Sequence, residues 1–167
     1  MKVPKIWKVL ILDDSSDSII ALKRATQDCF SKFGLKVEIG IEYSLFYGND
    51  TAQNWQPNII LLDIHMPPQA WRPDKKLLEK YPEWRDAAFA FCETITSDPR
   101  FSHTLVITIT EDPQAEIEAK ALAAGSHMHR LKDIVGNESS RTTFFKEILS
   151  NAARLINEED NSDASLA

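Results

Sequence analysis

Short runs of apolar residues alternate along the chain with longer segments in which apolar residues recur every three or four positions. Most of the runs are rich in Ile, Val and Leu, which is typical of strands buried on both faces of a parallel sheet. The longer segments have the period of amphipathic helices. This alternation predicts an α/β fold, a doubly wound (βα)5 domain with a five-stranded parallel sheet. The predicted strands are 6–12, 36–41, 58–62, 105–109 and 127–131.

The predicted helices cover both faces of this sheet. Ser15 and Ser16 are good N-caps for the first helix, and Gly34 is a good stop for it. The second helix has the weakest pattern because Gly48, Asn49 and Asp50 interrupt it. The helices are expected at about 16–33, 44–55, 82–98, 113–124 and 142–157, with a short additional helix at 74–81.

Three carboxylates follow two of the predicted strands. Asp13 and Asp14 come directly after the first strand, and Asp63 comes directly after the third. The carboxyl ends of parallel strands meet at the edge of the sheet that holds the ligand crevice in open α/β folds. Carboxylates that converge there repel one another unless a proton or a hard, oxygen-binding cation lies among them. The sequence therefore predicts a divalent-metal site at this edge.

Two further strands end in residues that suit such a site. Thr110 supplies a hydroxyl after the fourth strand, and Lys132 supplies an ammonium after the fifth. The order of acid pair, single acid, hydroxyl and amine resembles the receiver domain of two-component response regulators, which are CheY-like proteins. The resemblance covers about residues 6 to 157, and its most specific stretches are LILDDS, IILLDIHMP, VITIT and AGSHMHRLK.

The resemblance implies a role for each of these residues. Asp63 would be the phosphoacceptor, modified by a histidine kinase or a phosphotransfer protein. Mg²⁺ would be held by Asp13, Asp14, Asp63 and the main-chain carbonyl of His65. Thr110 and Lys132 would contact the phosphoryl group. The protein would then be a switch that acts by binding an unidentified downstream protein, not a turnover enzyme, and the resemblance also admits a homodimer.

Four positions depart from the pattern of the family, and one of them is Trp71, which falls near the usual glycine after the phosphoacceptor motif. Asp133 stands where receivers have a proline after the lysine, and Glu111 stands where they have a small residue. His129 occupies the position of the aromatic residue that rotates in the switch. These three favour an alternative, a phosphorylation-independent receiver that acts as an interaction scaffold. A second alternative, a Mg²⁺-dependent phosphohydrolase, would require an acid two positions after Asp63, where this chain has His65, which we expect to face the site and modulate it.

The segment 68–86 is an apparent insertion after the phosphoacceptor strand. It contains residues that are frequent in protein interfaces, namely Trp71, Arg72, Tyr81, Trp84 and Arg85. One interpretation is a surface loop with a short helix, because long insertions in loops cost little entropy. The other is a lid or a docking surface for a partner. The sequence leaves both open.

Composition narrows the class of protein. The 167 residues, 43% of them hydrophobic, suit one domain, expected at 1–157, followed by an acidic tail at 158–167 that we expect to be disordered. A net charge of −6 argues against nucleic-acid binding, which requires a basic face. The chain starts without a secretory signal pattern and has no apolar run near the ~18 residues of a membrane span. Cys29 and Cys92 are expected to be reduced core residues, and the expected location is the cytoplasm.

Overall fold

The central element of the structure, a computed structural model that describes residues 4–164 and side chains up to Glu158, is a five-stranded sheet. Its strand order is β2-β1-β3-β4-β5, and every neighbouring pair is parallel. This confirms the predicted doubly wound α/β fold. The strands are β1 (Trp7–Leu12), β2 (Val37–Glu42), β3 (Ile59–Asp63), β4 (Leu105–Thr110) and β5 (Met128–Leu131).

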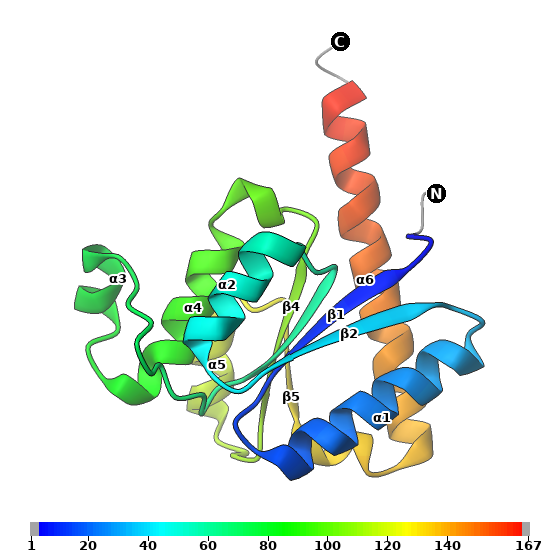
Figure 1. The fold of residues 1–167 in the computed structure, drawn as a ribbon, viewed down its shortest axis with the longest axis horizontal. Helices are drawn as coiled ribbons and strands as arrows, with labels where there is room; N and C mark the ends of the chain where they lie inside the picture. Colours follow the sequence, from blue (N-terminus) through cyan, green and yellow to red (C-terminus); the bar gives the residue numbers. More distant parts are fainter. Residues whose placement is uncertain (1–3, 165–167) are drawn as a thin grey trace.

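Helices cover both faces of the sheet (Figure 1). One face is covered by α1 (Ser16–Lys32) and α6 (Glu138–Ala164). The other face is covered by α2 (Leu45–Trp55), α4 (Ala87–Thr96) and α5 (Ala115–Ala123). A short helix, α3 (Lys75–Lys80), lies on the outer side of α4, away from the sheet. Three single 3₁₀ turns complete the chain: η1 (Trp84–Asp86), η2 (Pro99–Phe101) and η3 (Lys132–Val135).

The two hydrophobic layers follow from the alternation of side chains along each strand. In β1, Val9 and Ile11 pack on the α1 and α6 side, whereas Leu10 and Leu12 pack on the α2 and α4 side. Because both faces are covered, β1, β3 and β4 have almost no polar residue in their interiors. Apart from Lys8 and Thr108, the polar residues fall at the carboxyl ends of these strands.

Helix α2 is continuous through Gly48, where the sequence pattern appeared to be interrupted. A Cβ atom on Gly48 would lie 2.6 Å from Leu12 Cδ2, which is closer than side chains tolerate. Glycine is therefore present because the helix approaches β1 closely, not because the helix ends. Gly34 has φ +69° and follows the last turn of α1, as predicted for its stop.

Helix α6 is longer at both ends than the sequence suggested. It begins at Glu138, where the side chain of Asn137 accepts a hydrogen bond from the N–H of Ser140 at 3.1 Å. It runs to Ala164 because neither glycine nor proline interrupts this stretch. The backbone of 158–164 belongs to this helix, and the predicted disorder of the tail 158–167 stays a prediction. Residues 165–167 lie outside the described part of the chain.

The segment 68–86 contributes to the hydrophobic core. Trp71 and Tyr81 are only 6% and 7% exposed, and the Trp71 ring meets the edge of Phe91 with centroids 5.6 Å apart. The Tyr81 hydroxyl donates a hydrogen bond to Glu93 Oε2 at 2.8 Å. The prediction that Trp71 and Tyr81 form a partner surface is therefore wrong, because α4 carries an apolar outer face that these rings cover.

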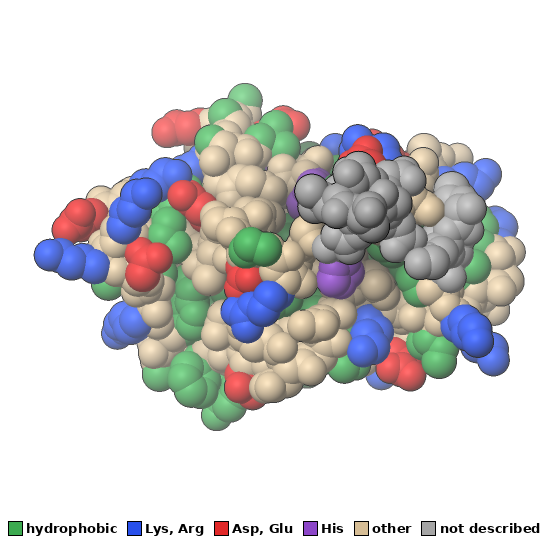
Figure 2. Space-filling view, turned by 90° about the horizontal axis from the view of Figure 1, so that it is seen from above, with side chains coloured by type: hydrophobic (Ala, Val, Ile, Leu, Met, Phe, Trp, Pro, Cys, Tyr) green, Lys and Arg blue, Asp and Glu red, His purple; other side chains and the backbone are tan. Residues whose placement is uncertain are grey.

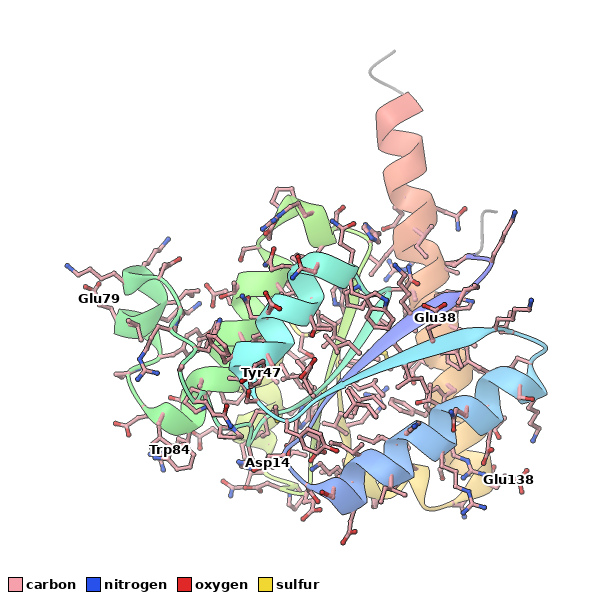
Figure 3. All side chains as sticks on the ribbon, viewed as in Figure 1. Asp14, Glu38, Tyr47, Glu79, Trp84 and Glu138 are labelled. Carbon is pink, nitrogen blue, oxygen red and sulfur yellow. The ribbon has the colours of Figure 1, made fainter. Side chains whose placement is uncertain are left out.

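The other three residues of that predicted surface are exposed. Arg72 donates hydrogen bonds to the main-chain carbonyls of Gln69 and Trp71, so it stabilises the loop itself. Trp84 is 69% exposed and projects from the molecule near Arg85 (Figure 3). Whether a partner uses this smaller surface stays a prediction.

The cysteines are in the reduced, buried state expected from the sequence, and the surface carries mixed charge. Cys29 and Cys92 are buried and free, and burial raises the pKa of the Cys92 thiol to about 12. Basic and acidic side chains are interspersed over the face seen in Figure 2. Within the described residues, no helix has both the length and the apolar character that crossing a bilayer requires.

Core packing of the 68–86 segment predicts a specific stability effect. Trp71→Ala should lower the free energy of unfolding by about 3 kcal/mol, because it removes a large ring that contacts Phe91. Trp84→Ala, the matched control, should change it by less than about 0.5 kcal/mol. Urea denaturation measures both values. Equal effects for the two variants would contradict the assignment of Trp71 to the core.

Candidate functional site

The three predicted acids converge at the carboxyl edge of the sheet. Asp13 and Asp14 follow β1, Asp63 ends β3, and these two strands are neighbours. Each residue offers one carboxylate oxygen, and the three oxygens lie within 4.8 Å of one another. Asp13 and Asp63 are buried, whereas Asp14 is exposed at the rim of the site (Figure 3).

Local hydrogen bonds orient the two buried carboxylates. Asp13 Oδ1 accepts a bond of 2.9 Å from the N–H of Ser15, the N-cap of α1. Asp63 Oδ1 accepts a bond of 3.1 Å from the N–H of His65. Each bond runs from a residue two positions further on, as is usual when an aspartate begins a turn. One oxygen of each carboxylate is therefore held by the backbone, and the other, Oδ2, meets Lys132.

Lys132 connects the two buried acids. Its Nζ lies 2.8 Å from Asp13 Oδ2 and 3.0 Å from Asp63 Oδ2, and it also donates to Ser18 Oγ at 3.3 Å. The lysine is the first residue after β5, and its side chain is 13% exposed. The sequence predicted that Lys132 would reach the acids, and the structure places it there. The peptide bond between Lys132 and Asp133 is trans.

Two buried carboxylates, Asp13 and Asp63, share the ammonium of Lys132, and this arrangement shifts the pKa values of the site. Burial raises the pKa of the Asp13 carboxyl, and the charge of Asp63 adds to this, outweighing the Lys132 and Ser15 contacts that lower it. Burial lowers the pKa of Lys132, but its contacts with Asp13 and Asp63 outweigh burial and raise it above the ordinary value. Lys132 is therefore charged at neutral pH, and a single positive charge faces two carboxylates and the nearby Asp14.

The donor set suits a divalent cation. Three carboxylates form a hard, oxygen-only group of the kind that Mg²⁺, Mn²⁺ and Ca²⁺ prefer. Among the residues that the structure describes, Asp13 Oδ2 is buried without a hydrogen bond of good geometry, since its contact with Lys132 is an ion pair only. A buried carboxylate oxygen with free lone pairs can act as a ligand. The cluster therefore constitutes a candidate divalent-metal site.

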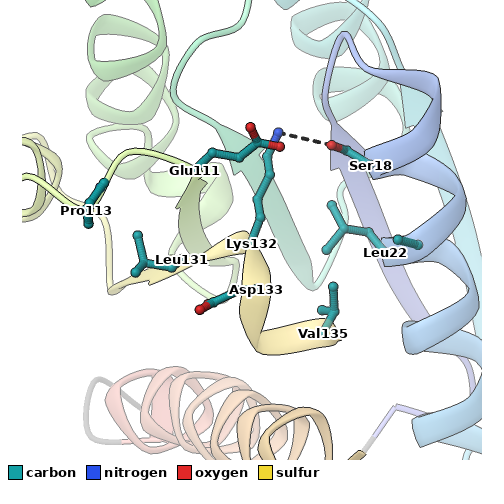
Figure 4. A pocket seen from close by; sticks show the side chains of 9 residues that line it. Ser18, Leu22, Glu111, Pro113, Leu131, Lys132, Asp133 and Val135 are labelled. Atoms are coloured by element: carbon teal, nitrogen blue, oxygen red, sulfur yellow. Dashed lines mark hydrogen bonds between the residues drawn. The ribbon is translucent and has the colours of Figure 1, made fainter. Parts of the chain in front are cut away.

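Thr110 and Glu111 lie at the end of β4, next to the acids. Thr110 is buried, and its hydroxyl accepts a hydrogen bond of 3.0 Å from the N–H of Asp112. Glu111 is exposed and lines a cavity of about 490 Å³ together with Lys132, Leu22 and other residues of α1 and η3 (Figure 4). The roles predicted for Thr110 and Glu111 toward a phosphoryl group stay predictions.

His129, at the predicted switch position, is held inside a buried polar network. His129 belongs to β5 and is only 7% exposed. Its ring atom Nδ1 lies 2.8 Å from Thr108 Oγ1. Thr108 Oγ1 also lies 3.0 Å from Ser126 Oγ, which donates to the carbonyl of Met128 at 2.6 Å. Burial lowers the pKa of His129, and Arg130 lowers it too, against the opposing effect of Glu118. The ring is therefore a neutral member of this network near pH 7.

His65 lies two positions after Asp63, beyond the end of β3. Its side chain is exposed and lines a second pocket of about 400 Å³ with Arg85, Asp112 and Lys120. Lys120 of α5 forms an ion pair of 2.6 Å with Asp86, so the end of the 68–86 segment is tied to α5. Arg85 and Asp86 are therefore residues of the segment that share this pocket with His65. The carbonyl of His65 as a metal ligand stays a prediction.

Two residues of this region were not found from the sequence. Ser18 contacts Lys132 from the first turn of α1, and Thr108 holds His129 from the middle of β4. No local pattern points to Ser18, because its contact with Lys132 joins residues 114 positions apart. Thr108 is a polar residue inside an apolar strand, which indicates a buried partner.

Comparison with sequence families and curated proteins yields no relative. No family model matches the chain, and no curated protein matches it. Similarity is found among solved structures, where the whole fold is compared.

Several receiver domains superpose on most of the chain. The signal receiver domain of the DNA-binding response regulator merR from Colwellia psychrerythraea 34H has a TM-score of 0.65 at 19% identity, covering 86% of this chain and 98% of that one. The chemotaxis response regulator CheY4 of Vibrio cholerae has a TM-score of 0.61 at 18% identity, covering 86% and 98%. The Mn²⁺-bound form of response regulator Rcp1 has a TM-score of 0.58 at 17% identity, covering 88% and 93%. This chain has the fold of CheY-like response regulator receiver domains, as its motifs predicted.

The acid cluster predicts how cation binding responds to mutation. Asp14→Asn should weaken the binding of Mg²⁺ or Mn²⁺ about tenfold or more, because it removes one anionic oxygen ligand without disturbing a buried contact. Isothermal titration calorimetry measures the affinity. Asp17→Asn, an exposed change in the first turn of α1, is the control and should leave it unchanged. Unaltered affinity in the Asp14 variant would refute the assignment.

Proposed function

We propose that this protein is a response regulator receiver that accepts a phosphoryl group on Asp63. The observation that carries the proposal is the position of Lys132, whose ammonium contacts both Asp13 and Asp63 beside the exposed carboxylate of Asp14. A structural role alone does not account for three acids and one lysine at this edge of the sheet, because burying Asp13, Asp63 and Lys132 costs free energy. The fold of the solved receiver domains supports the same conclusion.

The chemistry follows from the orientation of Asp63. A carboxylate oxygen attacks the phosphorus of the donor in line, a new P–O bond forms, and the bond from phosphorus to the donor breaks with its electron pair leaving on the donor. Lys132 pairs with the negative charge on the transferred group. Mg²⁺, held by Asp13, Asp14, Asp63 and the carbonyl of His65, would supply charge neutralisation when bound. Thr110 would donate a hydrogen bond to the phosphoryl oxygens.

The expected partners follow from this reaction. The donor is a sensor histidine kinase or a phosphotransfer protein, and the modified protein signals by changing which downstream protein it binds. No substrate is turned over, so we regard it as a phosphorylated switch and not an enzyme. The cytoplasm is the compartment in which such a phosphorelay would operate.

Phosphoryl acceptance can be tested with a small donor. Acetyl phosphate with Mg²⁺ should add one phosphoryl group, seen as a single mass increment by intact mass spectrometry. Asp63→Asn should abolish the increment, because an amide is not an anionic nucleophile. Asp133→Asn, which changes an exposed acid next to Lys132, should retain it. A wild-type protein that stays unmodified with acetyl phosphate and with several histidine kinases would overturn the proposal.

A second candidate function is a scaffold that binds its partner without phosphorylation. The observation that favours it is the network around His129, in which Thr108 and Ser126 hold the ring inside the protein. A ring held in this way does not rotate at low cost, because rotation breaks the buried hydrogen bond between His129 Nδ1 and Thr108 Oγ1.

Hydrogen exchange separates the switch from the scaffold. In a switch, phosphorylation should slow or speed amide exchange in α5 and in the β4 and β5 strands, and Lys132→Ala should accept the phosphoryl group but lose this response. The control is the Asp63→Asn variant treated with the same phosphoryl donor, whose amide exchange should not change. Modified wild-type protein with unchanged exchange in α5, together with unchanged partner binding, would favour the scaffold.

A further inference from the structure

Three oxygens surround the ammonium of Lys132, and they come from three different elements. Asp13 and Asp63 belong to the sheet edge, whereas Ser18 belongs to the first turn of α1. Figure 4 shows Lys132 extending from the end of β5 past the cavity, with its tip bonded to Ser18. Its contacts with Asp63 and Ser18 are hydrogen bonds, and its contact with Asp13 is an ion pair.

The backbone next to Lys132 does not by itself fix the position of the ammonium. Lys132 begins η3 and is followed by Asp133, whose φ no proline ring fixes. The long side chain has several rotatable bonds, and holding it at one position costs conformational entropy. The position of the ammonium therefore depends on its contacts.

Ser18 differs from the two acids in charge. The attraction of Asp13 and Asp63 for Lys132 changes whenever the charge of the acid cluster changes, as it does when Asp63 becomes an acyl phosphate. The Ser18 hydroxyl is neutral, so its hydrogen bond with the ammonium does not depend on that charge. Ser18 is itself held in place, since its N–H donates to Ser15 Oγ at 3.4 Å.

We infer that Ser18 is a positioning residue for Lys132, which keeps the ammonium beside Asp63 while the charge of the acid cluster changes. The effect of Ser18 on switching rests on the proposed function of Asp63. The effect of Ser18 on the position of the ammonium does not, because it is a property of the unmodified protein. Loss of one hydrogen bond to a neutral group should shift the ratio of switched to unswitched protein about fivefold toward the unswitched form.

The test compares Ser18→Ala with Ser18→Thr, which keeps the hydroxyl, and with Ser16→Ala, an exposed change in the same turn. The first readout is the ¹⁵N NMR signal of the Lys132 ammonium in unmodified protein, assigned with Lys132→Arg. Ser18→Ala should speed proton exchange of this ammonium and broaden its signal, and Ser18→Thr should restore it. The second readout is the exchange response of α5 after acetyl phosphate treatment, which Ser18→Ala should reduce and Ser18→Thr should restore.

The outcomes separate this inference from the proposed function. An unchanged Lys132 signal in Ser18→Ala, or an equal change in Ser16→Ala, overturns the role of Ser18 whether or not Asp63 is phosphorylated. A broadened signal that Ser18→Thr restores supports it, even in a protein that acetyl phosphate fails to modify. Such a failure would count against the proposed function alone.

Discussion

The contact of one ammonium with two buried carboxylates is the constraint on which the site depends. Asp13 and Asp63 are almost fully removed from water, and Lys132 is the cation that neutralises them. Removing one partner of such a group would leave an uncompensated charge inside the protein, which costs several kcal/mol. The ends of β1, β3 and β5 are therefore linked electrostatically as well as through the sheet. A change in the charge on Asp63 would change its attraction for Lys132, which begins η3 and contacts Ser18 of α1.

The same edge of the sheet explains why a cation or a phosphoryl group is an expected ligand. One lysine does not balance three carboxylates, and the raised pKa of Asp13 reflects this incomplete compensation. A divalent cation would relieve the repulsion more completely than a proton, because it also binds the exposed Asp14. The candidate metal site and the proposed phosphoacceptor are thus two consequences of one arrangement of charge.

The residues that depart from the family pattern lie around this centre and not within it. His129 is held inward by Thr108, and the 68–86 segment buries Trp71 and Tyr81 against α4. The ion pair between Asp86 and Lys120 then joins that segment to α5. The proposed chemistry at Asp63 does not require these residues, whereas the ion pair with Lys120 determines how α5 is attached to the 68–86 segment.

The sequence alone determined the order of elements, the sheet and the acids at its edge, because hydrophobic period and the position of polar residues after buried strands depend on local pattern. Tertiary structure decided what local pattern does not encode. Trp71 and Tyr81 looked like interface residues, but the apolar outer face of α4 covers them. Gly48 looked like a break, but the close approach of Leu12 requires it. Ser18 looked like one more serine near a helix start, and only the meeting of α1 with the end of β5, 114 positions later, places its hydroxyl on Lys132.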